Sequence, residues 1–198
     1  MNAFRFTPGR IIAVALVVVT AAAAGIGYYR MRGRAGLPPV GTDAYEQTTR
    51  RFYRGLAEMQ VGLLDVAAQS FTQATMLAPG EPAAWANLGL TELRLGEFDA
   101  AAPALERASA LAPRSSAVAF LRARLETTRG QRDAALAQLR RAIALDPANL
   151  FARTALVEEV ESAGTAEADA EAQRLLEEIV SAQPANPAVL VERARMAA

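Results

Sequence analysis

The sequence contains no cysteine, no histidine and no lysine, so that all 21 basic residues are arginine. The absence of cysteine excludes a disulfide framework, thiolate chemistry and the acylated cysteine of a lipoprotein. Without histidine or lysine there is no Ser-His pair, no Schiff base, no phosphate-loop lysine and no familiar zinc site. We therefore do not expect an enzyme, and the sequence predicts no catalytic, cofactor-binding or metal-ligating residue.

Carboxylates are the remaining groups that could bind a hard cation. Glu158, Glu159 and Glu161 lie close together in the sequence, and Glu177 and Glu178 follow. Their spacing forms no closed ligand loop of the kind that calcium sites use. We interpret them as the solvated faces of helices.

The charge is unevenly distributed along the chain. Residues 1–54 contain eight arginines against Asp43 and Glu46, whereas residues 55–198 contain 13 arginines against 19 acids. A net-acidic region without a basic stripe does not suit the phosphates of nucleic acid. Nucleic acid is therefore not an expected partner.

Glycine and proline recur with a period of 34 residues. Proline stands at Pro79, Pro113 and Pro147, and again at Pro184 after 37 residues. Four glycines are also 34 residues apart, namely Gly62, Gly96, Gly130 and Gly164. We predict that each of these glycines lies at the turn between two helices, where a residue with positive φ can end the first helix.

Small residues within each unit predict where its two helices touch. Gly89 and Ala101 mark this contact in the central unit, residues 82–115, and Gly55 and Ala67 mark it one period earlier. Glycine inside a helix costs about 1 kcal/mol relative to alanine, so its recurrence indicates a packing requirement. The single tryptophan, Trp85, should be structural, and Trp85→Ala should cost about 3 to 5 kcal/mol.

These features together resemble the tetratricopeptide repeat (TPR) family. The residues concerned are Trp85, Leu88 and Gly89 in the order W-x2-L-G, followed by A-x3-L and a proline, at a period of 34. The resemblance implies an all-α fold, a right-handed superhelix of about four helix-turn-helix repeats plus a C-terminal helix. We expect the solenoid over residues 42–198, with repeats at about 48–81, 82–115, 116–149 and 150–185 and a final helix at 186–198.

The N-terminal region has a different character. After a short tail, residues 1–10, the 19 residues 11–29 contain no charge and would form a helix of about 28 Å, close to the hydrocarbon thickness of a bilayer. We predict a transmembrane helix, followed by a linker at residues 30–41. The alternative is a cleaved signal peptide with its small-residue site at Ala22 to Ala24.

The orientation in the membrane is only weakly encoded. Arginines flank the apolar stretch on both sides, so the positive-inside rule is nearly tied, with a slight lean toward a cytoplasmic repeat domain. Similarity to envelope TPR proteins that have one N-terminal anchor instead favours a single-pass membrane protein with an extracytoplasmic, periplasmic repeat domain. Both orientations remain open at this point.

The TPR resemblance also implies a concave groove, lined by the first helix of each repeat, that binds extended or helical peptides. Counting around each first helix predicts eight groove residues: Phe52, Leu56, Met59, Leu90, Leu93, Arg94, Phe120 and Arg124. The same register adds Gln60, Thr127, Thr128, Thr154, Glu158 and Glu161. This surface would be apolar at its N-terminal end, basic in the middle and acidic at the far end. The alternative is that Phe52, Leu56 and Phe120 are core residues.

A chaperone-tail clamp, which some TPR proteins use to bind a carboxyl terminus, is not expected. Asn87 fits one of its places, but Phe52 and Leu56 stand where the clamp has lysine and asparagine, and Ala117 and Leu121 replace its later basic pair.

The sequence therefore predicts a membrane-anchored scaffold or adaptor of a bacterial envelope that binds a protein partner. Two alternatives belong to other classes of protein. The chain could be the N-terminal targeting and docking region of a larger envelope enzyme or secreted protein. It could also be a self-associating structural module, in which the final helix inserts into a neighbouring solenoid.

Overall fold

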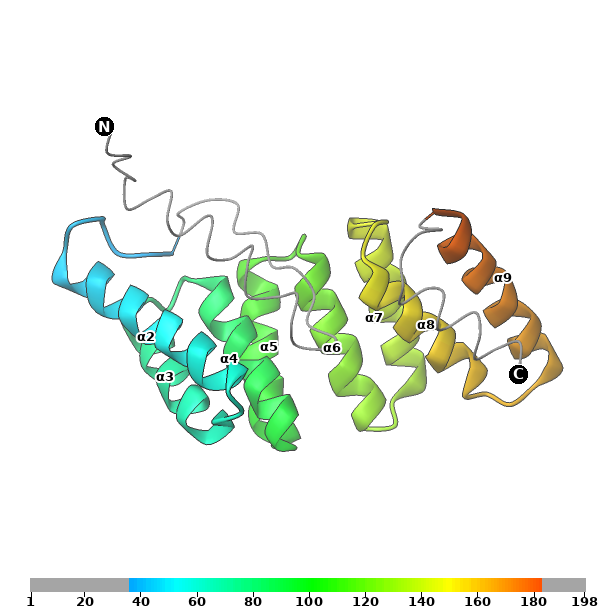
Figure 1. Cartoon of the computed structure of the whole chain (residues 1–198), viewed down its shortest axis with the longest axis horizontal. Coiled ribbons are helices and arrows are strands. Elements are labelled where there is room, and N and C mark those ends of the chain that lie inside the picture. Colours follow the sequence, from blue (N-terminus) through cyan, green and yellow to red (C-terminus); the bar gives the residue numbers. More distant parts are fainter. Residues whose placement is uncertain (1–35, 183–198) are drawn as a thin grey trace, which may run out of the picture.

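The computed structural model describes residues 36–182, which form eight helices arranged as four hairpins. The helices are α2 (Asp43–Gln60), α3 (Leu64–Leu77), α4 (Pro82–Leu95), α5 (Phe98–Leu111), α6 (Ser116–Thr128), α7 (Arg132–Leu145), α8 (Leu150–Glu161) and α9 (Ala166–Ala182). Each hairpin packs against the next one along the chain, which gives a row of helix pairs (Figure 1). The all-α repeat architecture that the sequence predicts is confirmed.

The first helix of each hairpin begins at a side-chain cap. Thr42, Ser115 and Asn149 each accept a hydrogen bond from the backbone N–H three residues later. Glu81 accepts one from the N–H of Ala83. These caps satisfy N–H groups in the first turn that have no partner within the helix, and so they fix where each repeat starts.

The turn inside each hairpin requires a glycine. The φ angles are +83° at Gly62, +80° at Gly96, +70° at Gly130 and +63° at Gly164. A side chain at such a φ would be strained, whereas glycine adopts it freely. The prediction from the 34-residue spacing is confirmed at all four turns.

Two further glycines allow the helices of a hairpin to approach each other. A Cβ atom at Gly55 would lie 2.9 Å from the ring of Phe71, and one at Gly89 would lie 2.6 Å from Cγ of Leu105. Ala101, which faces the same contact, is completely buried. The packing requirement predicted for Gly55 and Gly89 is confirmed.

The side chain of Trp85 packs against the core without being enclosed by it. Its ring is half-buried, and its Nε1–H donates a hydrogen bond to the carbonyl oxygen of Pro79 at 3.0 Å. Trp85 is structural, as predicted. Because the ring is partly exposed, we now expect Trp85→Ala to cost about 3 kcal/mol, the lower end of the range for such truncations.

The hydrophobic core consists of two clusters that meet at α6. The first cluster extends from α2 to α6 and the second from α6 to α9. Helix α6 contributes Val118, Leu121 and Leu125 to the first cluster and Ala119, Phe120 and Ala123 to the second. Adjacent positions of one helix therefore belong to different cores.

Arginine side chains connect neighbouring repeats through backbone carbonyls. Nη2 of Arg107 donates to the carbonyl oxygen of Pro79 at 3.4 Å, and Nη2 of Arg141 donates to that of Pro113 at 2.8 Å. The planar guanidinium can serve several acceptors at once, which the lysine ammonium does less well. These contacts give the arginines a structural use at the boundaries between repeats.

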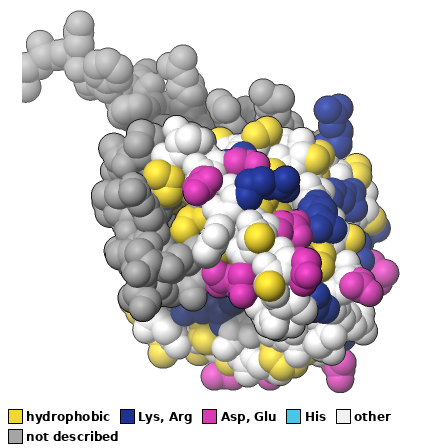
Figure 2. Space-filling model, turned by 90° about the vertical axis from the view of Figure 1, so that its right-hand side faces the viewer, with side chains coloured by type: hydrophobic (Ala, Val, Ile, Leu, Met, Phe, Trp, Pro, Cys, Tyr) yellow, Lys and Arg dark blue, Asp and Glu magenta, His cyan; other side chains and the backbone are white. Residues whose placement is uncertain are grey.

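The face at the α9 end of the row carries interleaved acidic and basic side chains (Figure 2). Two ion pairs involve α9, between Arg140 and Glu171 at 3.7 Å and between Arg174 and Glu178 at 3.9 Å. Glu177 and Glu178 are both exposed, which agrees with their interpretation as a solvated helix face.

The predicted tail at 1–10, the transmembrane helix at 11–29 and the final helix at 186–198 lie outside the described residues. Among the helices between residues 36 and 182, none combines the length and apolarity that crossing a bilayer requires.

Candidate functional site

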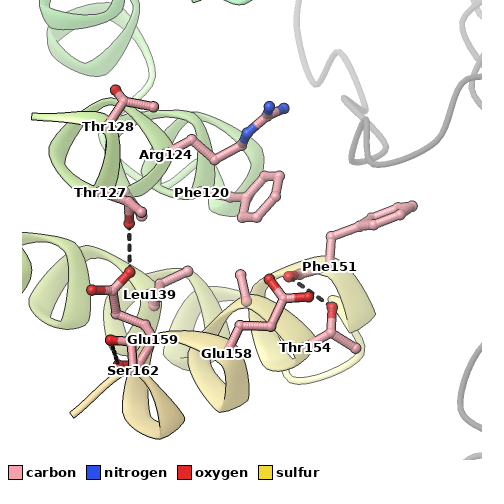
Figure 3. A pocket seen from close by; sticks show the side chains of 12 residues that line it. Phe120, Arg124, Thr127, Thr128, Leu139, Phe151, Thr154, Glu158, Glu159 and Ser162 are labelled. Atoms are coloured by element: carbon pink, nitrogen blue, oxygen red, sulfur yellow. Dashed lines mark hydrogen bonds between the residues drawn. The ribbon is translucent and has the colours of Figure 1, made fainter. Parts of the chain in front are cut away.

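The first helices of successive hairpins form one wall of the solenoid, because α4 contacts α6 and α6 contacts α8. A cleft of about 630 Å³ opens in this wall between α6 and α8 (Figure 3). Its lining residues are Phe120, Ala123, Arg124, Thr127 and Thr128 from α6, Leu139 from α7, and Phe151, Thr154, Ala155, Glu158, Glu159 and Ser162 from α8 and the turn after it.

Two phenylalanines supply the apolar part of the cleft. The ring centroids of Phe120 and Phe151 are 6.3 Å apart, and the ring planes are inclined at 35°. Phe120 is anchored in the second core cluster, whereas Phe151 is partly exposed. Figure 3 shows that the two rings come from opposite sides of the cleft, one from α6 and one from α8. An apolar side chain of a ligand could pack against the exposed part of Phe151, with the edge of Phe120, which is only 4% exposed, at the base of the cleft.

Hydroxyl groups hold the polar walls of the cleft in place. Oγ1 of Thr127 on α6 donates to Oε2 of Glu159 on α8 at 2.7 Å and so bridges the two helices (Figure 3). Oγ1 of Thr154 donates to the carbonyl oxygen of Leu150 at 3.1 Å, and Oγ of Ser162 donates to that of Glu159 at 2.7 Å. The Thr154 and Ser162 bonds lie within α8 and the turn after it, so the bond between Thr127 and Glu159 is the one that joins the two walls.

Arg124 is the cationic group of the cleft. Its side chain is half-buried, and it forms no hydrogen bond or ion pair with any other residue between 36 and 182. Burial lowers the pKa of the Arg124 guanidinium, and repulsion from Arg94 lowers it further. A partly desolvated charge without a counter-charge is unfavourable, so an anion bound here would be stabilised.

The structure brings together part of the predicted groove. Arg124 lines the cleft, together with Thr127, Thr128, Thr154 and Glu158 from the same register. Phe120 also borders the cleft, but it is only 4% exposed and belongs to the second core cluster, as the alternative interpretation predicted. Arg94 is exposed on α4, and its Nη1 donates to the carbonyl oxygen of Met59 at 3.3 Å. The other predicted residues lie elsewhere.

The five remaining predicted groove residues are enclosed in the first core cluster: Phe52, Leu56, Met59, Leu90 and Leu93. None is more than 9% exposed. Phe52, for example, packs edge-on against Phe71, with ring centroids 5.8 Å apart. The expected exposed apolar end of the groove is therefore corrected, because these side chains fill the space between hairpins.

The sequence analysis did not predict Phe151, which lies on the α8 side of the cleft. In the fourth repeat the predicted groove residues began at Thr154, one position after the tryptophan place, which left out the first turn of α8. A signal was nevertheless present. Phe151 lies three residues before Thr154 and seven before Glu158, a spacing that places all three on one helical face.

The geometry defines an α-solenoid of helical hairpins with a cleft on the wall of its first helices. A tetratricopeptide repeat family model matches residues 52–114 and, in overlap, residues 87–149. The chain is a tetratricopeptide repeat protein. Among curated proteins, none matches the sequence.

Several solved structures share this fold. MamA from Desulfovibrio magneticus RS-1, from residue 41 to its end, has a TM-score of 0.62 at 18% identity, covering 71% of this chain and 77% of that chain. The first TPR of Spaghetti (RPAP3), bound to the HSP90 peptide SRMEEVD, has a TM-score of 0.58 at 19% identity, covering 64% and 100%. The second TPR domain of human RPAP3, in complex with the HSP70 peptide SGPTIEEVD, has a TM-score of 0.56 at 20% identity, covering 59% and 97%. At these identities the likeness concerns the fold.

Proposed function

We propose that this protein is a non-catalytic scaffold that binds a segment of a partner protein in the cleft between α6 and α8. The observation that carries the proposal is the composition of that cleft. It contains an aromatic pair, a half-buried arginine that forms no ion pair with any residue from 36 to 182, and a hydrogen bond that joins its two walls. Apolar surface with a few fixed polar groups is what binding sites generally present.

The dimensions of the cleft suit a few side chains of a larger ligand. Its volume of about 630 Å³ falls within the range of ligand pockets, roughly 300 to 1,000 Å³. Buried aromatic residues and arginine are also the residue types that contribute most to protein interfaces. The two RPAP3 domains, solved with HSP90 and HSP70 peptides, provide a precedent for peptide binding by a domain of this fold.

A photo-crosslinking amino acid at position 151 tests the proposal in living cells. A matched control carries the same group at Glu106, which is exposed on α5. We expect position 151 to crosslink one defined segment of a partner, and position 106 not to do so. Thr154→Arg should abolish the crosslink, because a bulky side chain would fill the cleft. If the same proteins crosslink from both positions, or the crosslink survives Thr154→Arg, the cleft is not the binding site.

We further propose that residues 11–29 anchor the protein as a single-pass helix, with the repeat domain on the extracytoplasmic side. The support is the uncharged stretch itself and the arginines that flank it. Protease added to spheroplasts should then digest the repeat domain while the anchor stays in the carbonate-resistant membrane fraction. Protection of the repeat domain would indicate the cytoplasmic orientation, and a mature chain that lacks residues 1–24 would indicate a cleaved signal peptide.

A further inference from the structure

We infer that the α6/α8 cleft selects a partner segment that carries two features. One is a side-chain carboxylate, which binds Arg124, and the other is an aromatic or large aliphatic side chain, which packs on the exposed ring of Phe151 beside the edge of Phe120. This inference rests on the proposed function and specifies the chemistry of its ligand.

The charge of Arg124 is not balanced by its neighbours in the cleft. Thr127 and Thr128, the next cleft residues along α6, donate their hydroxyl protons to Glu159 and to the carbonyl oxygen of Leu125. Nearby Arg94 has the same charge and opposes that of Arg124. No group between residues 36 and 182 therefore pairs with the guanidinium, and a carboxylate of a partner could do so. Arginine binds a carboxylate through two parallel hydrogen bonds, which also fixes its orientation.

The aromatic rings of the cleft lie close to the Arg124 side chain. Figure 3 shows the Arg124 side chain beside Phe120 on α6, with Phe151 projecting from α8 across the cleft. A ligand side chain that packs on the rings therefore has its neighbours along the partner chain close to the guanidinium. Residues three or four apart on a helix, or two apart on an extended segment, lie on one face and could meet both features.

Two carboxylates line the cleft on the side of α8. Glu158 and Glu159 line the α8 side, opposite Arg124. Glu159 accepts a hydrogen bond from Thr127 and is paired with Arg132, with Nε and Oε1 4.0 Å apart, so its charge is already compensated within the protein. Because the wall continues from α4 through α6 to α8, we assign the carboxylate to a side chain within a segment that passes through the cleft.

Binding of defined peptides to the full-length chain in lipid nanodiscs tests the inference. The probes are three pools of acetylated and amidated fluorescent peptides that share one fixed phenylalanine. The pools differ at the position three residues after the phenylalanine, which is glutamate in the first pool, glutamine in the second and arginine in the third. All other positions are occupied by alanine, serine or glycine. End-capping removes any terminal carboxylate. We expect the glutamate pool to bind on the order of tenfold more tightly than the glutamine pool, which is typical for a charge-assisted hydrogen bond.

Three variants assign the preference to Arg124. Arg124→Gln should lose the preference for glutamate over glutamine, and Arg124→Glu should prefer the arginine pool. Arg122→Gln is the matched control, because Arg122 lies on the same helix but does not line the cleft, and it should keep the preference. Since Arg124 pairs with no group in the part of the chain that the structure describes, its replacement should leave the helical circular dichroism unchanged.

The outcomes separate the two proposals. Binding of all pools with equal affinity, or a preference that survives Arg124→Gln, would overturn the inference while leaving peptide binding in the cleft intact. Absence of binding by every pool would count against both the inference and the proposed function.

Discussion

At the scale of single residues, Glu92 on α4 is in an unfavourable position for a charge. Its Oε2 atom is buried without a hydrogen-bond partner, counting the residues between 36 and 182. Burial, together with repulsion from Glu97, raises the pKa of Glu92 from its usual 4.5 to about 7. Between these two values the folded protein retains a proton that the unfolded chain releases. The free energy of unfolding therefore falls as the pH rises through this window.

Replacing Glu92 by glutamine should remove this pH dependence. We expect Glu92→Gln to be more stable than the parent protein at pH 8 by about 1 to 2 kcal/mol, a value reduced because water partly screens the carboxylate. At pH 4, where both states of the parent are protonated, the gain should be small. Urea unfolding followed by circular dichroism at both pH values measures the difference. Glu106→Gln, at an exposed site on α5, controls for the loss of a charge. A gain of equal size at both pH values would contradict the assignment.

At the scale of helices, the contact between α4 and α5 depends on the absence of a side chain at Gly89. Gly89→Ala would bring a methyl group to 2.6 Å from Cγ of Leu105, which is completely buried. Overpacking of this kind costs about 1 to 3 kcal/mol and exceeds the gain of up to about 1 kcal/mol from alanine's helix propensity. We expect net destabilisation, measured by urea unfolding.

A double variant makes this prediction specific. In a Leu105→Ala background the clash is absent, so Gly89→Ala should there be neutral or stabilising, and the two effects should not add. Destabilisation of the same size in both backgrounds would show that the cost does not arise from contact with Leu105.

The turns and helix contacts could be predicted from the sequence because each depends on one residue type at one place. Gly62 and Gly96 adopt a positive φ, and Gly55 and Gly89 allow two helices to approach closely. A 34-residue spacing of glycines was therefore sufficient to predict both features. Such features are local, and the chemistry of glycine is distinctive.

The wall of the solenoid could be predicted only in part. Leu90 and Leu93 repeat with helical spacing, but a first helix packs against its own partner helix and against both neighbouring hairpins. An apolar residue on it therefore looks the same whether it faces a groove or another hairpin, and these two prove to be core residues. Arg124 could be placed on the wall because burying a charge in the core would be costly. The contribution of Phe151 depended on how α8 lies against α6, which the sequence does not encode locally.

At the scale of the whole molecule, the two core clusters should open separately. In a solenoid each repeat contacts only its neighbours, so a local loss of stability is not shared equally along the row. Leu139→Ala, in the second cluster, should cost about 2 to 5 kcal/mol and should increase hydrogen exchange more in α7 to α9 than in α2 to α5.

The reverse pattern is expected for Leu105→Ala, which lies in the first cluster. Hydrogen exchange measured by mass spectrometry distinguishes the two regions peptide by peptide. An equal increase along all eight described helices in either variant would mean that the solenoid unfolds as one cooperative unit.

The arginine contacts at the repeat boundaries have a consequence for the ancestry of the chain. Arg107 reaches the carbonyl of Pro79 and Arg141 reaches that of Pro113, so the same junction recurs one period later. If residues 82–115 were deleted, Arg141 would take the place of Arg107 opposite Pro79. If they were duplicated, the new copy would bring its own arginine and its own acceptor. Each repeat therefore contains the arginine that contacts the repeat before it. A gene of this kind can gain or lose whole repeats by unequal recombination, because the same contact forms again at the new boundary.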